Sequence, residues 1–312
     1  MEVRFFYTTG KQDIIESTYD KPEPEANEIE VMNIMTGVCR SDIDMYNGDF
    51  ELPSIYMQGH EGIGQVTKVG EDVYGVEVGN YVATRGEPAF ADWYNVKTDE
   101  FVIVPEAHPK YIIEPVACAI NLYFTVQDDI DMRSEIIILG TGFLATVLLK
   151  TLRWHGCFNP VTVVGNANKE FWENARGVAY YTTLDEIPEK NLYNMVFDLS
   201  PKPEYVNIVD RLANNGTIIM GAEKHPNVPL PIDKLLWKAA KIEFPSPRNE
   251  LFIDAMERGV DMIDDGTLDT SPLWTMEYDR TTEVEQAFLH GTNRPEGYSR
   301  GYIVWGVNCK RN

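Results

Sequence analysis

The sequence predicts an α/β protein that combines a mostly-β domain with a doubly wound parallel sheet. At 312 residues, the chain is long enough for two domains. Residues 1–110 contain short apolar runs separated by glycine, proline and acidic residues, a pattern typical of short strands. From Ser134 onward, a continuous apolar run, a glycine-rich turn and a helical stripe follow one another, and this begins an alternation of strands and helices.

The first 110 residues favour a compact, irregular barrel. We expect strands at residues 30–34, 64–69, 81–84 and 101–104. No helical period persists across this stretch, which favours a mostly-β domain.

The second domain begins with a dinucleotide-binding fingerprint. Residues 135–139 form an apolar run typical of a buried parallel strand, and Gly140-Thr141-Gly142-Phe143-Leu144-Ala145 follows at once. Gly140 permits the tight turn, Gly142 lets the backbone approach a pyrophosphate, and Ala145 allows close helix packing. The helix that starts here offers its N–H groups to the phosphates, so we expect cofactor contacts at Gly140, Gly142, Phe143 and Leu144.

The end of the next strand, residues 160–164, bears on cofactor choice. NAD-specific sites usually carry an acidic residue here, but this chain reads Gly165-Asn166-Ala167-Asn168-Lys169. Without a carboxylate nothing repels a 2′-phosphate, and Lys169 can attract one, which favours NADP. Asn166 can also bond a free ribose hydroxyl, so NAD stays open. Further strands are expected at 195–198, 217–220 and 241–244, with helices at 205–212 and 233–240.

Three residue types that bind zinc lie close together in the first domain. Cys39 precedes the adjacent pair His60-Glu61 by 21 residues. Structural zinc sites use four Cys/His ligands in tight pairs, so this looser spacing favours an open site that leaves a position for water or substrate.

The string Gly59-His60-Glu61, with Gly64, Gly70 and Val73, resembles the signature of the zinc-containing alcohol dehydrogenases in the medium-chain dehydrogenase/reductase superfamily. Cys39-Arg40-Ser41-Asp42 resembles that family's first zinc-ligand motif. The resemblance implies a GroES-like domain at residues 1–120 and 249–312, where two helical stretches and a closing strand at 301–307 return to it. It implies a Rossmann domain at 121–248, with the active site in the cleft between the domains.

The resemblance also implies roles for single residues. Ser41 matches the hydroxyl that relays the alcohol proton, Asp42 the carboxylate that orients the zinc histidine, and Arg40 a residue that reaches the cofactor pyrophosphate. Ser200 lies in a later turn that faces the cofactor. Asp44 stands where many relatives carry a relay histidine, so the proton can leave through Asp44 or directly to water.

Glu114-Pro115 resembles the polyol, sugar and threonine dehydrogenase branch. There the glutamate binds zinc or holds its water. Both Glu114 and Glu61 are therefore candidate ligands beside Cys39 and His60, while Cys118 is expected to pack on a helix. The lobe of four cysteines that holds a second zinc in many relatives is missing, because no cysteine lies between Cys39 and Cys118. We expect one catalytic zinc and no structural zinc.

Composition restricts the partners. A formal net charge of −22 argues against nucleic acid, and no apolar run is long enough to span a membrane. The N-terminus does not resemble a signal peptide, and four sparse cysteines favour a reducing cytoplasm. We expect a homo-oligomer, a dimer or tetramer, that transfers hydride between NAD(P) and an alcohol or ketone of polyol, sugar or amino-alcohol type. The alternatives are a zinc-free quinone-reductase-like enzyme and a non-catalytic dinucleotide-binding protein.

Overall fold

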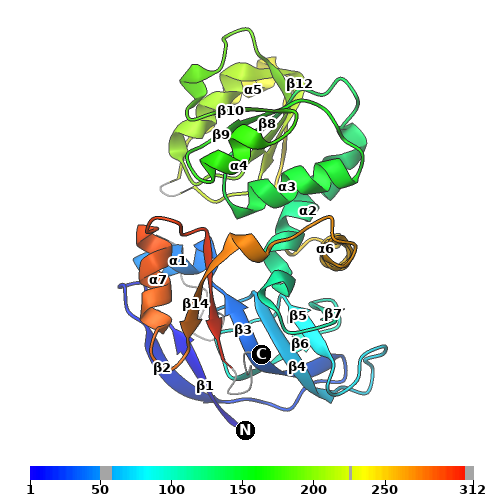
Figure 1. The fold of residues 1–312 in the computed structure, drawn as a ribbon, viewed down its shortest axis with the longest axis vertical. Helices are drawn as coiled ribbons and strands as arrows, with labels where there is room; N and C mark the ends of the chain where they lie inside the picture. Colours follow the sequence, from blue (N-terminus) through cyan, green and yellow to red (C-terminus); the bar gives the residue numbers. More distant parts are fainter. Residues whose placement is uncertain (50–57, 225–226, 306–312) are drawn as a thin grey trace. The chain divides into compact units, whose positions relative to one another are not determined.

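The computed structural model describes residues 1–49, 58–224 and 227–305, and its contacts divide the chain into two units (Figure 1). The first unit comprises Met1–Val116 together with the chain from Met256, and the second is Ala117–Ala255. These divisions fall inside two helices, α2 (Glu114–Val126) and α6 (Phe252–Asp264), whereas sequence analysis places the boundaries near residues 120 and 249.

The first unit is built on a seven-stranded mixed sheet and a small hairpin. Its strand order is β14-β15-β3-β4-β5-β7, with β6 also paired to β3. The strands are β3 (Glu28–Gly37), β4 (Gly62–Val69), β5 (Tyr81–Thr84), β6 (Trp93–Lys97), β7 (Phe101–Val104), β14 (Trp274–Asp279) and β15 (Arg300–Val304), while β1 (Glu2–Tyr7) and β2 (Ile15–Asp20) form the hairpin. All four strands expected in residues 1–110 are present.

Residues 1–110 are mostly β, as expected, but they also contain one α-helix among the described residues, which the sequence pattern does not indicate. Helix α1 (Arg40–Asn47) follows β3, and its first turn is closed by a capping box between Cys39 and Asp42. With eight residues it is too short to show a repeating apolar stripe. Its apolar side chains Ile43, Met45 and Tyr46 are nevertheless buried, so packing stabilises the helix.

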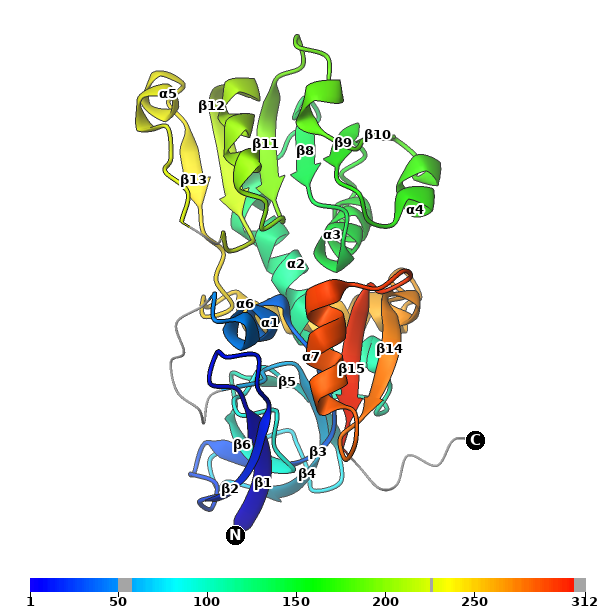
Figure 2. The ribbon, with the colours of Figure 1, turned by 90° about the vertical axis from the view of Figure 1, so that its left-hand side faces the viewer.

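The tail of the chain completes the first unit. Helix α7 (Val284–Asn293) packs on α1 and β15 (Figures 1 and 2). The closing strand was expected, but β14, which pairs in parallel with β15, was not. Residues 306 and 307 of the expected strand lie outside the described residues.

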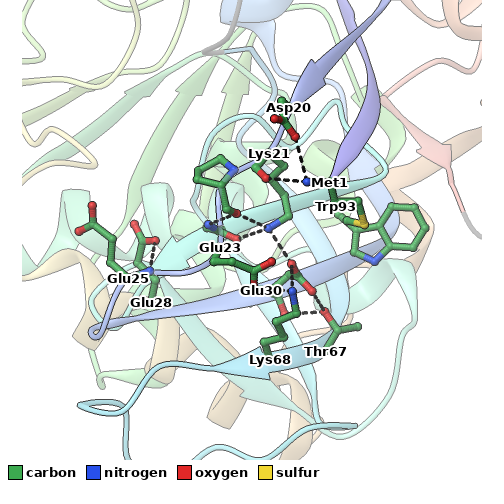
Figure 3. A network of polar contacts seen from close by, with 12 residues as sticks. Met1, Asp20, Lys21, Glu23, Glu25, Glu28, Glu30, Thr67, Lys68 and Trp93 are labelled. Carbon is green, nitrogen blue, oxygen red and sulfur yellow. Dashed lines mark hydrogen bonds and ion pairs between the residues drawn. The ribbon is translucent and has the colours of Figure 1, made fainter.

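A buried ion pair supports the first unit at β3 (Figure 3). Lys21 Nζ lies 2.7 Å from Glu30 Oε2, and the two side chains are only 2% and 5% exposed. The same Nζ donates to the Pro22 carbonyl and to Asn95 Oδ1, both at 2.8 Å. Glu30 also meets Lys68 Nζ at 3.3 Å and accepts from Thr67 Oγ1 at 2.8 Å. Both charges are therefore paired and hydrogen-bonded, as burial requires.

The second unit is a six-stranded parallel sheet with helices, as predicted. Figure 2 shows its strand order, β10-β9-β8-β11-β12-β13. Successive strands are added on one side of β8 as far as β10 and on its other side from β11 onward. The strands are β8 (Ile136–Leu139), β9 (Val161–Val164), β10 (Val178–Tyr181), β11 (Tyr193–Asp198), β12 (Leu212–Met220) and β13 (Lys241–Glu243). The helices are α3 (Phe143–Trp154), α4 (Lys169–Asn174) and α5 (Ile232–Trp237), and the helix expected at 205–212 is a 3-10 helix, Pro203–Arg211. Among the described residues, no helix combines the length and apolar character needed to cross a bilayer.

Candidate functional site

Three side chains with metal-binding atoms meet in the first unit. Cys39 is the N-cap of α1, just after β3, while His60 and Glu61 come directly before β4. The antiparallel pairing of β3 with β4 joins these two places, since Thr36 lies opposite Gly62 and the Gly37 N–H donates to the Glu61 carbonyl at 2.9 Å. One ligand atom from each of Cys39, His60 and Glu61 lies within 4.8 Å of the others. Strand pairing thus converts a loose sequence spacing into a compact cluster.

The cluster fits a zinc ion. A thiolate, an imidazole and a carboxylate are the donors zinc prefers, and three protein ligands leave a fourth position open. Glu61 is fully buried, and its Oε2 has no hydrogen-bond partner within the described part of the chain. A buried carboxylate oxygen without a partner is costly unless a cation meets it. Gly37 makes room for this carboxylate, because a Cβ at that position would overlap Glu61 Oε2.

Asp42 connects two members of the cluster. Its Oδ2 accepts from the Cys39 N–H at 2.8 Å, and its Oδ1 lies 3.8 Å from His60 Nδ1. Burial raises the pKa of Asp42 to about 6, although the neighbouring His60 opposes that rise.

The surroundings of His60 and Cys39 raise the pKa of both groups. Burial lowers the pKa of His60, but the charges of Asp42 and Cys39 outweigh it and raise that pKa well above 6.5. Burial also raises the pKa of the Cys39 thiol, and Glu61 raises it further. A divalent cation would compete with protons for both groups, so its affinity should fall as the pH falls.

Arg300 is a residue of this site that sequence reasoning missed. Its Nη2 forms an ion pair with Glu61 Oε1, and its guanidinium carbon lies 5.5 Å from the centre of the Trp274 ring. Arg300 is the first residue of β15, 239 positions after Glu61. In the sequence, Arg300 is a basic residue directly before the strand expected at 301–307, and this position does not indicate a partner.

The other predicted residues lie around this cluster in different ways. Glu114 is buried at the start of α2 and helps to raise the pKa of His60, but its carboxylate is not among the described ligand atoms within 4.8 Å of one another. Ser41 lies in the first turn of α1. Arg40 Nε donates to Asp44 Oδ1 at 2.7 Å, so these two predicted residues are paired with each other. Cys118 lies half-buried on α2.

The second unit holds the glycine-rich turn. Gly140 has a φ of +116°, and a Cβ there would meet the Leu199 carbonyl oxygen at 3.0 Å, so this position needs glycine. Gly142 is the N-cap of α3 and has a φ of −88°. A Cβ at Gly142 would meet nothing within 4 Å, which leaves open space at the helix N-terminus beside Phe143 and Leu144. That space fits a phosphate, which the N–H groups of α3 would bind.

Replacing Gly142 by alanine should therefore separate folding from cofactor binding. The new methyl group meets no described atom, so the free energy of unfolding should change by less than about 1 kcal/mol. It would occupy the space where we expect the pyrophosphate, so the Kd for NAD(P)H should rise at least about tenfold, or about 1.4 kcal/mol. Fluorescence titration with NAD(P)H and urea denaturation would measure the two effects. Unchanged affinity would show that the dinucleotide does not approach Gly142.

The remaining predicted cofactor residues lie at strand ends of this unit. Asn166 and Lys169 are exposed after β9, and Lys169 Nζ lies 3.5 Å from Glu173. Ser200 is buried after β11, where its carbonyl accepts from Lys224 Nζ at 2.8 Å. Lys224 also pairs with the buried Asp198 at 2.9 Å.

Comparison with known proteins gives one domain match and several distant relatives. Residues 25–107 match the alcohol dehydrogenase GroES-like domain. D-arabitol-phosphate dehydrogenase of Enterococcus avium is 24% identical over 44% of this chain and 48% of its own length. The NAD-dependent alcohol dehydrogenase of Saccharolobus solfataricus is 24% identical over 67% of this chain and 76% of its own length. This chain thus spans about half of the first relative and three quarters of the second.

The fold has close counterparts among solved structures. S. aureus TarJ in complex with NADPH superposes with a TM-score of 0.80 over 98% of this chain and all of that one. The sequences are only 16% identical, so this likeness concerns the fold.

Proposed function

We propose that this chain is a zinc-dependent oxidoreductase that transfers hydride between an alcohol and NAD(P). It belongs to the zinc-type alcohol dehydrogenase family of the medium-chain dehydrogenase/reductase superfamily. The convergence of Cys39, His60 and Glu61 on one point carries the proposal. A dinucleotide-binding protein without catalysis needs no such cluster. A zinc-free relative would not need it either.

The chain's own residues have separable tasks in this reaction. Cys39 and His60 would hold the metal, and Asp42 keeps the histidine ring oriented through its Nδ1 side. Zinc bound there supplies a Lewis acid that lowers the pKa of an alcohol oxygen. Ser41 would accept the alcohol proton and pass it on. Asp44 is buried and paired with Arg40, so we favour direct transfer from Ser41 to water over a route through Asp44.

The zinc content is proposed to be one ion per chain. Glu61 is the third ligand favoured by the cluster, and Glu114 is the candidate that holds the water in the open position. Metal analysis of purified protein after zinc supplementation should give about one zinc per chain. A value near zero would favour the zinc-free alternative, and a value of two would require a second site.

The substrate class proposed is a polyol, a sugar alcohol or its phosphate, or an amino alcohol. Glu114 supports this branch, as does the similarity to D-arabitol-phosphate dehydrogenase. A screen of these alcohols and the matching ketones with NAD(H) and NADP(H), followed at 340 nm, tests the proposal. Turnover that disappears on chelation and returns with zinc is the expected result. Cofactor binding without turnover on any member would favour the non-catalytic alternative.

The cofactor proposed is NADP(H) in preference to NAD(H). Exposed Asn166 and Lys169 follow β9, where a carboxylate would otherwise repel a 2′-phosphate. Asn166→Asp should weaken NADP(H) at least about tenfold, roughly 1.4 kcal/mol, while changing NAD(H) little. Paired titrations with both cofactors measure this, and Asn174→Asp on the exposed side of α4 is the control for an added charge. Tighter binding of NAD(H) by the wild type would overturn the preference.

A further inference from the structure

We propose that Arg300 is a positioning residue that shares the Glu61 carboxylate with the bound metal and so makes Glu61 a weak, displaceable ligand. This inference rests on the proposed metal site. It concerns the residue that sets how strongly one ligand binds.

The two carboxylate oxygens of Glu61 have different contacts. Oε1 accepts from Arg300 Nη2, whereas Oε2 has no hydrogen-bond partner among the described residues. The side chain is fully buried, so no solvent compensates its charge. Arg300 and a bound metal would therefore both interact with one buried carboxylate, from which water is excluded.

Arg300 is itself held in place. Its side chain is 12% exposed, and its guanidinium carbon lies 5.5 Å from the centre of the Trp274 ring. A Cβ at Gly37 would meet the same Trp274 ring at 3.0 Å, so Gly37 and Trp274 pack tightly around the Glu61 carboxylate. A planar guanidinium restrained in this way fixes the direction of the carboxylate that it binds.

Removing Arg300 should therefore strengthen metal binding. A buried carboxylate that has lost its arginine is strongly destabilised until another cation meets it. In Arg300→Met the metal becomes that cation, so Glu61 should become a permanent ligand. An arginine with a merely structural role would lower the stability of the metal-free and metal-loaded protein equally.

The test uses metal-free full-length protein titrated with Zn²⁺ and with Co²⁺, whose visible spectrum reports coordination. Arg300→Met should lower the metal Kd at least about tenfold, a typical size for coupling between two ligands. Its Co²⁺ spectrum should change, and zinc should raise its Tm more than that of the wild type. Arg280→Met is the matched control: Arg280 is 5% exposed, pairs with Glu16 and Asp92, and lies over Trp305. It should leave the metal Kd within about twofold.

Glu61→Gln distinguishes an effect of Arg300 through the Glu61 carboxylate from direct repulsion between the Arg300 charge and the metal cation. If Arg300 acts through Glu61, then Arg300→Met in the Glu61→Gln background should change the metal Kd by no more than about twofold. A tenfold gain that persists in this background would overturn the proposal, as would a wild-type-like or weaker Kd in Arg300→Met. Should Arg300→Met fail to fold, Arg300→Lys replaces it, with a Kd decrease of more than about twofold expected and an unchanged Kd contradicting. Wild-type protein that binds no metal would instead overturn the proposed metal site itself.

Discussion

Cys39→Ala should abolish both zinc binding and turnover while leaving the dinucleotide site intact. The thiolate is one of only three described ligand atoms within 4.8 Å of one another. Loss of a residue that merely supports a ligand costs up to about a hundredfold, so loss of the ligand should exceed that. Zinc per chain should fall from about one to near zero, and kcat/KM by more than about a hundredfold. Metal analysis and steady-state kinetics measure the two effects.

Cys118→Ala is the matched control for this variant. Cys118 is also a half-buried cysteine, but it lies on α2 and does not belong to the ligand cluster. It should keep its zinc and its turnover. NAD(P)H affinity should be nearly unchanged in both variants, because the glycine-rich turn belongs to the other unit. Turnover by Cys39→Ala at the wild-type rate would rule out zinc chemistry at this cluster.

Lys21→Met should destabilise the first unit by about 3 kcal/mol, at the lower end of the 3–5 kcal/mol lost when a buried ion pair loses one partner. The variant leaves Glu30 buried, and the remaining cation paired with it in the described part of the chain is Lys68, at 3.3 Å. Lys68 is 43% exposed, so it compensates only in part. Urea denaturation followed by circular dichroism would measure the free energy of unfolding.

Two comparisons test this reasoning. Lys68→Met removes only the more exposed partner and should cost much less stability than Lys21→Met. Lys21→Met combined with Glu30→Met removes both charges and should recover part of the loss. Equal losses for Lys21→Met and Lys68→Met would show that burial does not control the energy of this pair.

The same pair predicts a dependence of stability on pH. Burial raises the pKa of Glu30, but Lys21 outweighs it, and the pKa lies below 4.5. Since the folded pKa is lowered, the stabilisation is complete above pH 4.5 and is lost as the pH falls through the folded pKa. Acid should therefore remove most of the difference between the wild type and Lys21→Met.

The sequence by itself determined the parts of this protein that depend on local pattern. The apolar run of β8, the turn at Gly140 and Gly142, and helix α3 are neighbours in the chain, and each has a periodicity or backbone requirement that is visible in the letters. The sequence also marked Cys39 and His60-Glu61 as candidate metal ligands, because few residue types bind zinc. Helix α1 could not be predicted from the sequence, because eight residues are too few to display a helical period.

Only the tertiary structure decided which groups meet. Sequence analysis left Glu61 and Glu114 as rival ligands, and the pairing of β3 with β4 brings Glu61 into the group with Cys39 and His60. Arg300 reaches Glu61 from β15, which pairs with β3 beside β4. A contact across 239 residues has no periodicity and no motif. The contact exists because strands from distant parts of the chain share one sheet, and a buried carboxylate there is stable only beside a cation.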